Sequence, residues 1–336
     1  EGNTRISGNL TLTLGKLTCT TEAGAARTFT VDGTTEIGPD SGAADQATLT
    51  ATSEDLLLGS GITSSAYGLY VKQGGTFVGG TGTHTLGSLI VYNNAAAKCT
   101  LTSGVTTING EHGGENYAIN VGGSAPTFAH GSGTVTLTRA SDTRIRNAGA
   151  ALALNHLIIN HASAVITLAS NGLTCAGNMT VTAGEFGTGA DKALTVTGHV
   201  SITGDLLCNA STVVMGSCIV NASGTLTAPT SSGSFTINSE SSSHAFRVSG
   251  SGELVNSDGT LTITTPAETR IKMNGTGNLH SLTVNHASCV VFTHTDSAGI
   301  TVEGNLTITA GQLSTMEQGG SDKNLTVTGA TTVSNG

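Results

Sequence analysis

Residues 177–184 read Gly-Asn-Met-Thr-Val-Thr-Ala-Gly, and residues 304–311 repeat them as Gly-Asn-Leu-Thr-Ile-Thr-Ala-Gly. In both stretches apolar residues alternate with threonine, and a glycine stands at each end. Alternation with a period of two places the apolar side chains on one face of a short strand. Glycine permits the tight corner that follows such a strand. The two stretches therefore predict short, half-buried strands separated by sharp corners.

The neighbouring segments repeat with nearly the same spacing. Gly133-Thr-Val-Thr-Leu-Thr138 returns as Gly259-Thr-Leu-Thr-Ile-Thr264 after 126 residues, and His156-Leu-Ile-Ile-Asn-His-Ala-Ser163 returns as Ser281-Leu-Thr-Val-Asn-His-Ala-Ser288 after 125 residues. A partial copy, Gly8-Asn-Leu-Thr-Leu-Thr-Leu-Gly15, lies near the start of the chain. A unit of about 126 residues is therefore duplicated.

The repeats predict one continuous array over residues 1–336. Residues 1–110 hold partial or degenerate copies, residues 111–238 hold a full copy, and residues 239–336 hold a second full copy that is truncated. Because the array begins within a unit, we expect it to be an excerpt of a longer chain.

The composition favours a solenoid among all-β folds. Charged residues make up 10% of the chain, Trp is absent, and the alternating strands are rich in Val, Ile, Leu and Thr. A β-sandwich core is wide and commonly anchored by Trp and Tyr, whereas a solenoid interior is narrow and filled by ladders of aliphatic side chains. The expected fold is all-β: a single-chain β-solenoid, similar to a parallel β-helix, that forms a repeat rod. At ~20 to 25 residues per coil and ~4.8 Å per coil, it would have roughly 14 to 16 coils and a length of ~70 Å.

Charge and hydropathy exclude two classes of partner. With a net charge of −9 and only 13 Lys and Arg residues, the chain offers little to neutralise a phosphate backbone, so we expect no nucleic acid partner. No run of about 18 apolar residues occurs, which argues against membrane insertion. No motif calls for a cofactor.

Six cysteines are spread along the chain without a CxxC pair or a Cys/His cluster at zinc-ligand spacing. Each lies in an apolar, strand-like context, which predicts buried free thiols and no metal site. One pair, Cys208 and Cys218, could lie on adjacent coils, so a disulfide between them is the alternative.

Two pairs of cations recur in a chain that is poor in charge. Arg144 and Arg146 follow a Thr-rich strand, and Arg270 and Lys272 occupy the matching positions of the next copy. A spacing of two residues places both cations of a pair on one strand face. These four residues form a candidate contact strip for an anionic glycan or a partner subunit. The alternative, which we favour, is a solvated face paired with a carboxylate such as Asp142 or Glu268.

Other candidate chemistry is weak. His161 and His286 recur because their unit is copied, so we interpret them as corner residues rather than metal ligands. The best local aromatic cluster for stacking sugars is Tyr67, Tyr70, Phe77 and Tyr92. An enzyme that cleaves acidic polysaccharides needs paired carboxylates. No two of the candidate carboxylates can be placed on one face; they are Asp40, Asp45, Glu54, Glu111, Glu115, Asp191, Glu303 and Asp322.

The tandem pattern of residues 177–198 and 304–329 resembles repeat regions of bacteriophage fibre and other virion appendage proteins, and is also similar to secreted bacterial β-solenoid adhesins. The resemblance implies a structural component of an extracellular or virion filament, without enzymatic activity or cofactor. It would act as a stiff spacer or host-contacting appendage, and its partners would be further copies of itself, other subunits or host-surface glycans. A cell-surface adhesin and a polysaccharide-degrading tail spike are the alternatives.

Overall fold

The computed structural model describes residues 3–20, 27–41, 45–60, 67–112, 114, 116–294, 297, 299–315 and 322–334. They form a β-solenoid of about 13 turns, and no helix occurs among them. This confirms the predicted fold class. The number of turns is lower than the predicted 14 to 16 because some coils are long. Asn178 bonds to a residue 21 positions further along the chain, whereas Leu56 bonds to one 28 positions further along.

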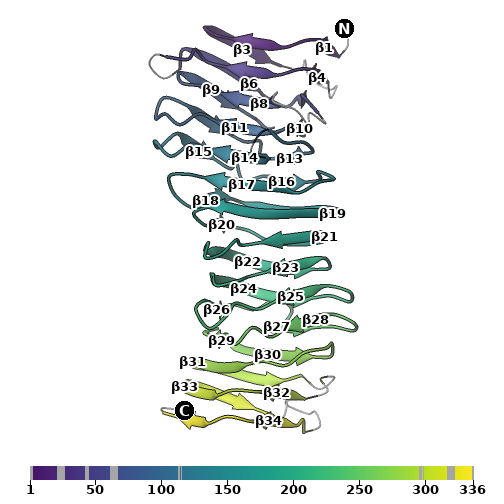
Figure 1. Cartoon of the computed structure of the whole chain (residues 1–336), viewed down its shortest axis with the longest axis vertical. Helices are drawn as coiled ribbons and strands as arrows, with labels where there is room; N and C mark the ends of the chain where they lie inside the picture. The colour runs from purple at the N-terminus through teal and green to yellow at the C-terminus, as the bar shows by residue number, and fades with distance from the viewer. Residues whose placement is uncertain are drawn as a thin grey trace. The chain divides into compact units, whose positions relative to one another are not determined.

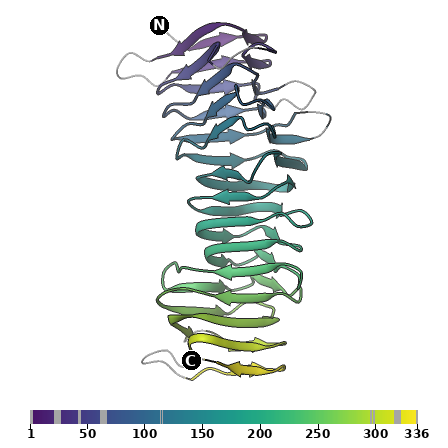
Figure 2. The same ribbon diagram turned by 90° about the vertical axis from the view of Figure 1, so that its left-hand side faces the viewer.

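The coils divide into two compact units, residues 1–174 and residues 175–336, which are described separately. In each unit the strands of successive coils lie side by side (Figures 1 and 2). All pairings between the strands named below are parallel, as expected when each coil repeats the direction of the previous one.

Unit 1 has three rows of strands. Row A contains β1 (Thr4–Ile6), β4 (Thr28–Val31), β7 (Asp55–Leu58), β10 (His84–Leu86), β13 (Val105–Ile108), β16 (Thr134–Leu137) and the first part of β19 (His156–Ser170). Row B contains β2 (Leu10–Leu12), β5 (Thr35–Ile37), β8 (Leu69–Val71), β11 (Leu89–Val91), β14 (Tyr117–Val121), β17 (Thr143–Asn147) and the second part of β19. Row C contains β3 (Gly15–Cys19), β6 (Ala47–Ala51), β9 (Gly75–Val78), β12 (Lys98–Thr100) and β15 (Thr127–Ala129). Two short strands follow, β18 (Leu152–Leu154) and β20 (Leu173–Cys175).

Unit 2 also has three rows, and its longer strands turn a corner and join two of them. Row D contains β22 (Leu194–Ile202), β24 (Thr212–Val220), β26 (Ser234–Ile237), β29 (Thr260–Ile263), β31 (Ser281–Thr293), β33 (Leu306–Ser314) and β35 (Thr331–Val333). Row E contains β21 (Met179–Gly187), β27 (His244–Val248), β30 (Glu268–Met273) and parts of β22, β24, β31 and β33. Row F contains the end of β21, β23 (Asp205–Leu207), β25 (Thr225–Thr227) and β28 (Glu253–Val255). A separate pair joins β32 (Ile300–Val302) to β34 (Leu325–Val327).

The core of unit 1 consists of aliphatic ladders, as the alternation predicts. One ladder in row A runs through six consecutive coils in register, and each side chain is at most 1% exposed; its members are Val31, Leu58, Leu86, Ile108, Leu137 and Ile159. Burial of each such side chain contributes about 1.5–3 kcal/mol to stability. Outward threonines such as Thr85, Thr107 and Thr136 alternate with the ladder and are half-buried.

The copied segments fold in the same way in the two units. In unit 1, β16 pairs with β19 so that Val135 lies beside Leu157. In unit 2, β29 pairs with β31 so that Leu261 lies beside Leu282. The sequence duplication therefore corresponds to a duplication of strand pairing.

The repeated Gly-Asn dipeptide has a structural role that we name the Asn corner. Oδ1 of the asparagine accepts a backbone N–H of the next coil, at 2.9 Å from Asn9 to Thr34, 2.9 Å from Asn178 to His199 and 3.0 Å from Asn305 to Ala330. A glycine precedes each donor. At Gly33 a Cβ atom would lie 2.1 Å from Oδ1 of Asn9, so the corner requires glycine there.

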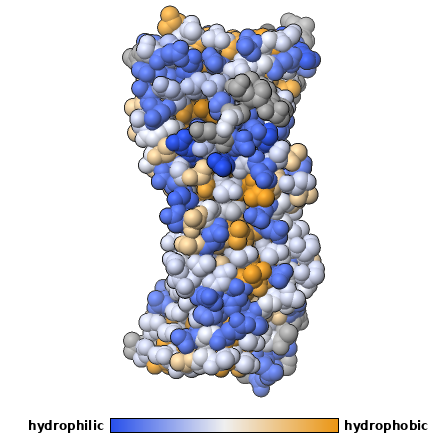
Figure 3. Space-filling model, in the orientation of Figure 1, coloured by the Kyte–Doolittle hydropathy of each residue, from blue (hydrophilic) through white to orange (hydrophobic). Residues whose placement is uncertain are grey.

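Polar residues dominate the face of the molecule that Figure 3 shows, and apolar residues form small separate patches. No helix within the described ranges is long and apolar enough to cross a membrane.

Candidate functional site

The cation strip of unit 1 lies where the spacing predicts. Arg144 and Arg146 point outward from β17, whereas Ile145 between them and Thr143 before them are buried. Asp142, the proposed partner, uses Oδ1 to accept the backbone N–H of Val165 at 3.1 Å.

The cation strip of unit 2 has the same geometry. Arg270 and Lys272 alternate in β30 with the buried residues Thr269 and Ile271. Lys272 lies in register with Arg247 of β27, which adds a third cation to this face. The two strips belong to different units, and their role as a contact surface remains a prediction.

The six cysteines are free and buried, which confirms the expected thiols, and Cys208 and Cys218 form no disulfide. Burial raises the pKa of the Cys208 thiol to about 12, so this thiol is protonated and unreactive at neutral pH. Among the described residues, no group of three or more His, Cys, Asp or Glu side chains is placed to hold a metal ion.

The recurring histidines are corner residues. Nδ1 of His161 accepts the backbone N–H of Ser163 at 3.3 Å, and Nδ1 of His286 accepts that of Ser288 at 3.2 Å. The two histidines occupy equivalent positions of β19 and β31 and make the same contact with the backbone two residues further on, which gives their recurrence a structural reason.

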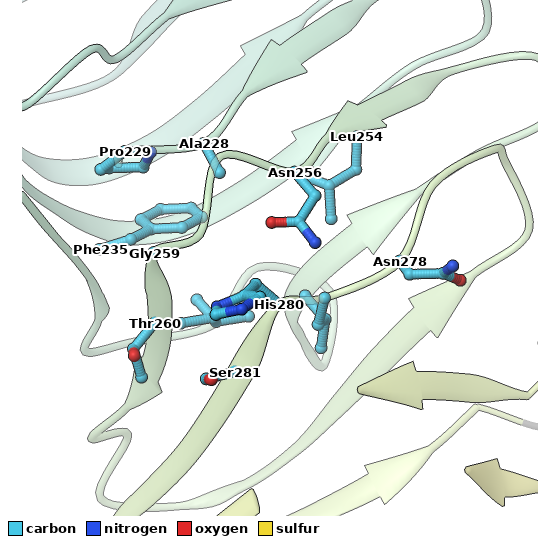
Figure 4. Close-up of a pocket in the computed structure, with 12 residues that line it drawn as sticks. Ala228, Pro229, Phe235, Leu254, Asn256, Gly259, Thr260, Asn278, His280 and Ser281 are labelled. Carbon is cyan, nitrogen blue, oxygen red and sulfur yellow. The ribbon is translucent and has the colours of Figure 1, made fainter. Parts of the chain in front are cut away.

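A small pocket in unit 2 is lined mainly by Phe235, Leu254, Leu261, Leu279 and His280. Figure 4 shows Phe235, Leu254 and His280 around it. Its cavity volume is about 20 Å³. That volume is close to the minimum for one water molecule, so the pocket is too small for a substrate or cofactor.

The strongest candidate site is a groove on row B of unit 1, which three of the four tyrosines of the chain line, while the fourth, Tyr117, contacts its residue Arg146. Tyr67 precedes β8, Tyr70 lies in β8, Tyr92 follows β11 and Tyr117 begins β14. The ring centroids of Tyr67 and Tyr70 are 4.5 Å apart, and those of Tyr70 and Tyr92 are 6.2 Å apart. Burial raises the pKa of the Tyr70 hydroxyl above its ordinary value of 10.

Strand register places the floor of the groove. In β8, β11, β14 and β17, which lie side by side in Figure 1, the outward residues Tyr70, Ile90, Asn120 and Arg146 occupy one register position. The guanidinium carbon of Arg146 lies 5.7 Å from the ring centroid of Tyr117, within the range of a cation–π contact.

His112 forms one wall of the groove. Its ring stacks on Tyr67 with a centroid distance of 4.3 Å, and its backbone N–H donates to the carbonyl of Tyr117 at 2.8 Å. The preceding residue, Glu111, forms a buried ion pair with Arg139, with 2.5 Å between Oε1 and Nη2. This pair anchors the loop that carries His112.

Gly122 and Gly123 line another side of the groove. A Cβ atom at Gly122 would lie 2.2 Å from the Cα atom of Asn93, so no larger residue fits there without a shift. The tyrosine groove has a cavity volume of about 260 Å³ and is lined by Tyr67, Tyr70, Ile90, Val91, Tyr92, Asn93, His112, Asn120, Gly122, Gly123, Arg146 and Ala148.

The groove corrects the predicted aromatic cluster. Tyr67, Tyr70 and Tyr92 come together, but Phe77 is fully buried in row C, because its position in β9 points inward. The sequence reading missed His112 and the connection between the aromatic cluster and Arg146. The outward parity of neighbouring strands in row B could have placed Arg146 beside Tyr70, whereas His112 lies between β13 and β14 and carries no such signal.

Two of the candidate carboxylates, Glu54 and Glu303, make structural hydrogen bonds. Glu54 is buried and accepts the backbone N–H groups of Thr52 and Ser53, each at 3.2 Å. Glu303 binds the side-chain amides of Asn256 and Asn278 at 2.7 and 2.9 Å. Glu54 thus stabilises its own turn, and Glu303 links residues of neighbouring coils. Glu115 lies outside the described residues.

Comparison of the chain with protein-family models, with curated proteins and with solved structures finds no match.

Proposed function

We propose that this chain is a structural segment of an extracellular or virion filament, in which it acts as a stiff spacer or as part of a host-contacting appendage. The observation that supports this role is the parallel, in-register pairing of coil after coil within each unit. Such coils bury one another's edges, so stability extends through contacts between nearest neighbours. Further copies of the chain or other filament subunits are the expected partners.

A cell-surface adhesin is the second candidate, and the tyrosine groove favours it, since an exposed aromatic site suits contact with a ligand. A polysaccharide-degrading tail spike is the third. Glycoside hydrolysis typically uses two carboxylates that flank the bond to be cleaved. The described residues that line the groove include no Asp or Glu. We therefore place the enzyme behind the spacer and the adhesin.

Pulling the chain from both ends in an optical trap tests the spacer role. We expect abrupt steps, each releasing one or more coils of about 18 to 28 residues, because neighbouring coils unfold as paired units. Smooth extension at the low force of an unstructured chain would contradict the proposal. Shortening of an acidic polysaccharide, followed by size-exclusion chromatography, would instead support the tail-spike alternative.

A further inference from the structure

We infer that the tyrosine groove binds a saccharide that carries a carboxylate group. This inference goes beyond the spacer role and is independent of it, because it rests only on the side chains of row B in unit 1.

The aromatic rings suit the apolar face of a pyranose. Tyr92 is 39% exposed, and its ring lies 6.2 Å from that of Tyr70 at an angle of 52°. Two tilted rings at this separation form a cradle in which a sugar ring contacts one face while its hydroxyls reach the other wall. Tyrosine provides such contacts at low entropic cost and adds a hydroxyl as a polar partner.

Polar groups within the groove match the hydroxyls of a sugar. The ring of His112 lines the groove and stacks on Tyr67, while its buried Nδ1 atom is shielded from a ligand there. Asn120 places a side-chain amide, with two donor hydrogens and one acceptor oxygen, on the floor of the groove. A few placed polar groups in an aromatic pocket are the usual means of orienting a small ligand.

The charge of the groove favours an acidic sugar. Arg146 is the residue with a formal charge among the described lining residues. Nearby Lys72 contacts Glu36 at 3.3 Å and Asp40 at 2.6 Å, and these three groups together carry a net charge of −1, so Arg146 supplies the positive charge of the groove. A guanidinium binds a carboxylate through paired hydrogen bonds that an ammonium cannot reproduce.

The test is a printed array of neutral and acidic saccharides, probed with the labelled full chain. We expect binding to saccharides that contain a sugar acid and weaker binding to their carboxyl-reduced forms. Tyr92→Ala and Arg146→Met should each lower the apparent affinity for the strongest hit by about tenfold or more, because each removes at least ~1.4 kcal/mol of contact. Binding should also weaken as salt is raised.

Two control variants separate the groove from the surrounding surface. Lys16→Met removes an exposed cation of β3 in row C, which does not line the groove, and should leave binding unchanged. Tyr92→Phe keeps the ring and should retain most of the affinity. Absence of array binding, binding that persists in Tyr92→Ala, or equal binding of carboxyl-reduced forms would each overturn the inference. A thermal melt of every variant confirms that the fold is retained.

Discussion

Oδ1 of Asn178 accepts the backbone N–H of His199 at 2.9 Å, so a single side chain joins two successive coils of unit 2. The same bond recurs at the other Asn corners. At the corner, the asparagine side chain accepts a backbone N–H that a carbonyl would accept within a strand. This bond holds the two successive coils in register. This explains why the repeat retains Gly-Asn at its corner positions.

Replacement of Asn178 by alanine tests the Asn corner. Asn178→Ala should lower the free energy of unfolding by about 1 kcal/mol, the typical net value of one such hydrogen bond. Urea denaturation measures the loss. Asn178→Asp keeps an acceptor oxygen and should lose less than half as much; equal losses for the two variants would show that the bond is unimportant.

The glycine opposite an Asn corner should be intolerant of substitution. In Gly33→Ala the new Cβ would lie 2.1 Å from Oδ1 of Asn9, so the corner must shift and stability should fall by about 1–3 kcal/mol. Gly8 belongs to the same corner, but a Cβ there meets nothing within 4 Å. Gly8→Ala is therefore the matched control. A similar melting temperature for both variants would refute the close approach.

A buried histidine makes stability depend on pH. His84 is fully buried; its Nε2 donates to the carbonyl of Gly79 at 2.6 Å, and its Nδ1 accepts the N–H of Leu56. Burial holds its pKa below the ordinary value of 6.5, so the unfolded chain binds the proton more readily. The free energy of unfolding should thus be highest above pH 6.5 and fall as the pH drops below it.

Urea denaturation between pH 7.5 and 5 measures this dependence. His84→Gln should flatten the slope, although the pKa values of His199 and His244, which burial also lowers, leave a residual slope of the same sign. If His84→Gln left the pH dependence of the free energy of unfolding unchanged, His84 would not contribute to it.

Removal of only one partner of the Glu111–Arg139 ion pair should strongly lower the free energy of unfolding. Side chains of Glu111 and Arg139 are only 8% and 9% exposed, so either Glu111→Leu or Arg139→Met leaves a charge buried without its partner. Each single variant should lose about 3–5 kcal/mol, and the double variant should recover much of that loss. Additive losses in a double-mutant cycle would contradict the pairing.

The sequence predicts the strands and core of each unit but not the groove. Alternation and glycine corners are local signals, and they suffice to place residues such as Leu58 and Leu86 in a buried ladder. The groove depends instead on which outward residues of different coils share a register. Because coil lengths are unequal, the spacing along the chain does not reveal that Tyr70 and Asn120 share one row.

The alternation of side chains along β9 explains why Phe77 does not join the aromatic cluster that the sequence predicts. Its neighbour Thr76 faces outward, where its hydroxyl donates a 2.7 Å hydrogen bond to Asp45. Because side chains alternate along a strand, Phe77 faces the core. An aromatic residue can anchor either a core or a ligand, and only the direction of its side chain decides between them.

Immunogold electron microscopy of the natural source, with antibodies raised against the folded chain, tests the filament proposal most directly. The account predicts gold particles along filaments that project from a virion or a cell surface. Gold confined to the cell interior, with none on any projecting filament, would contradict it.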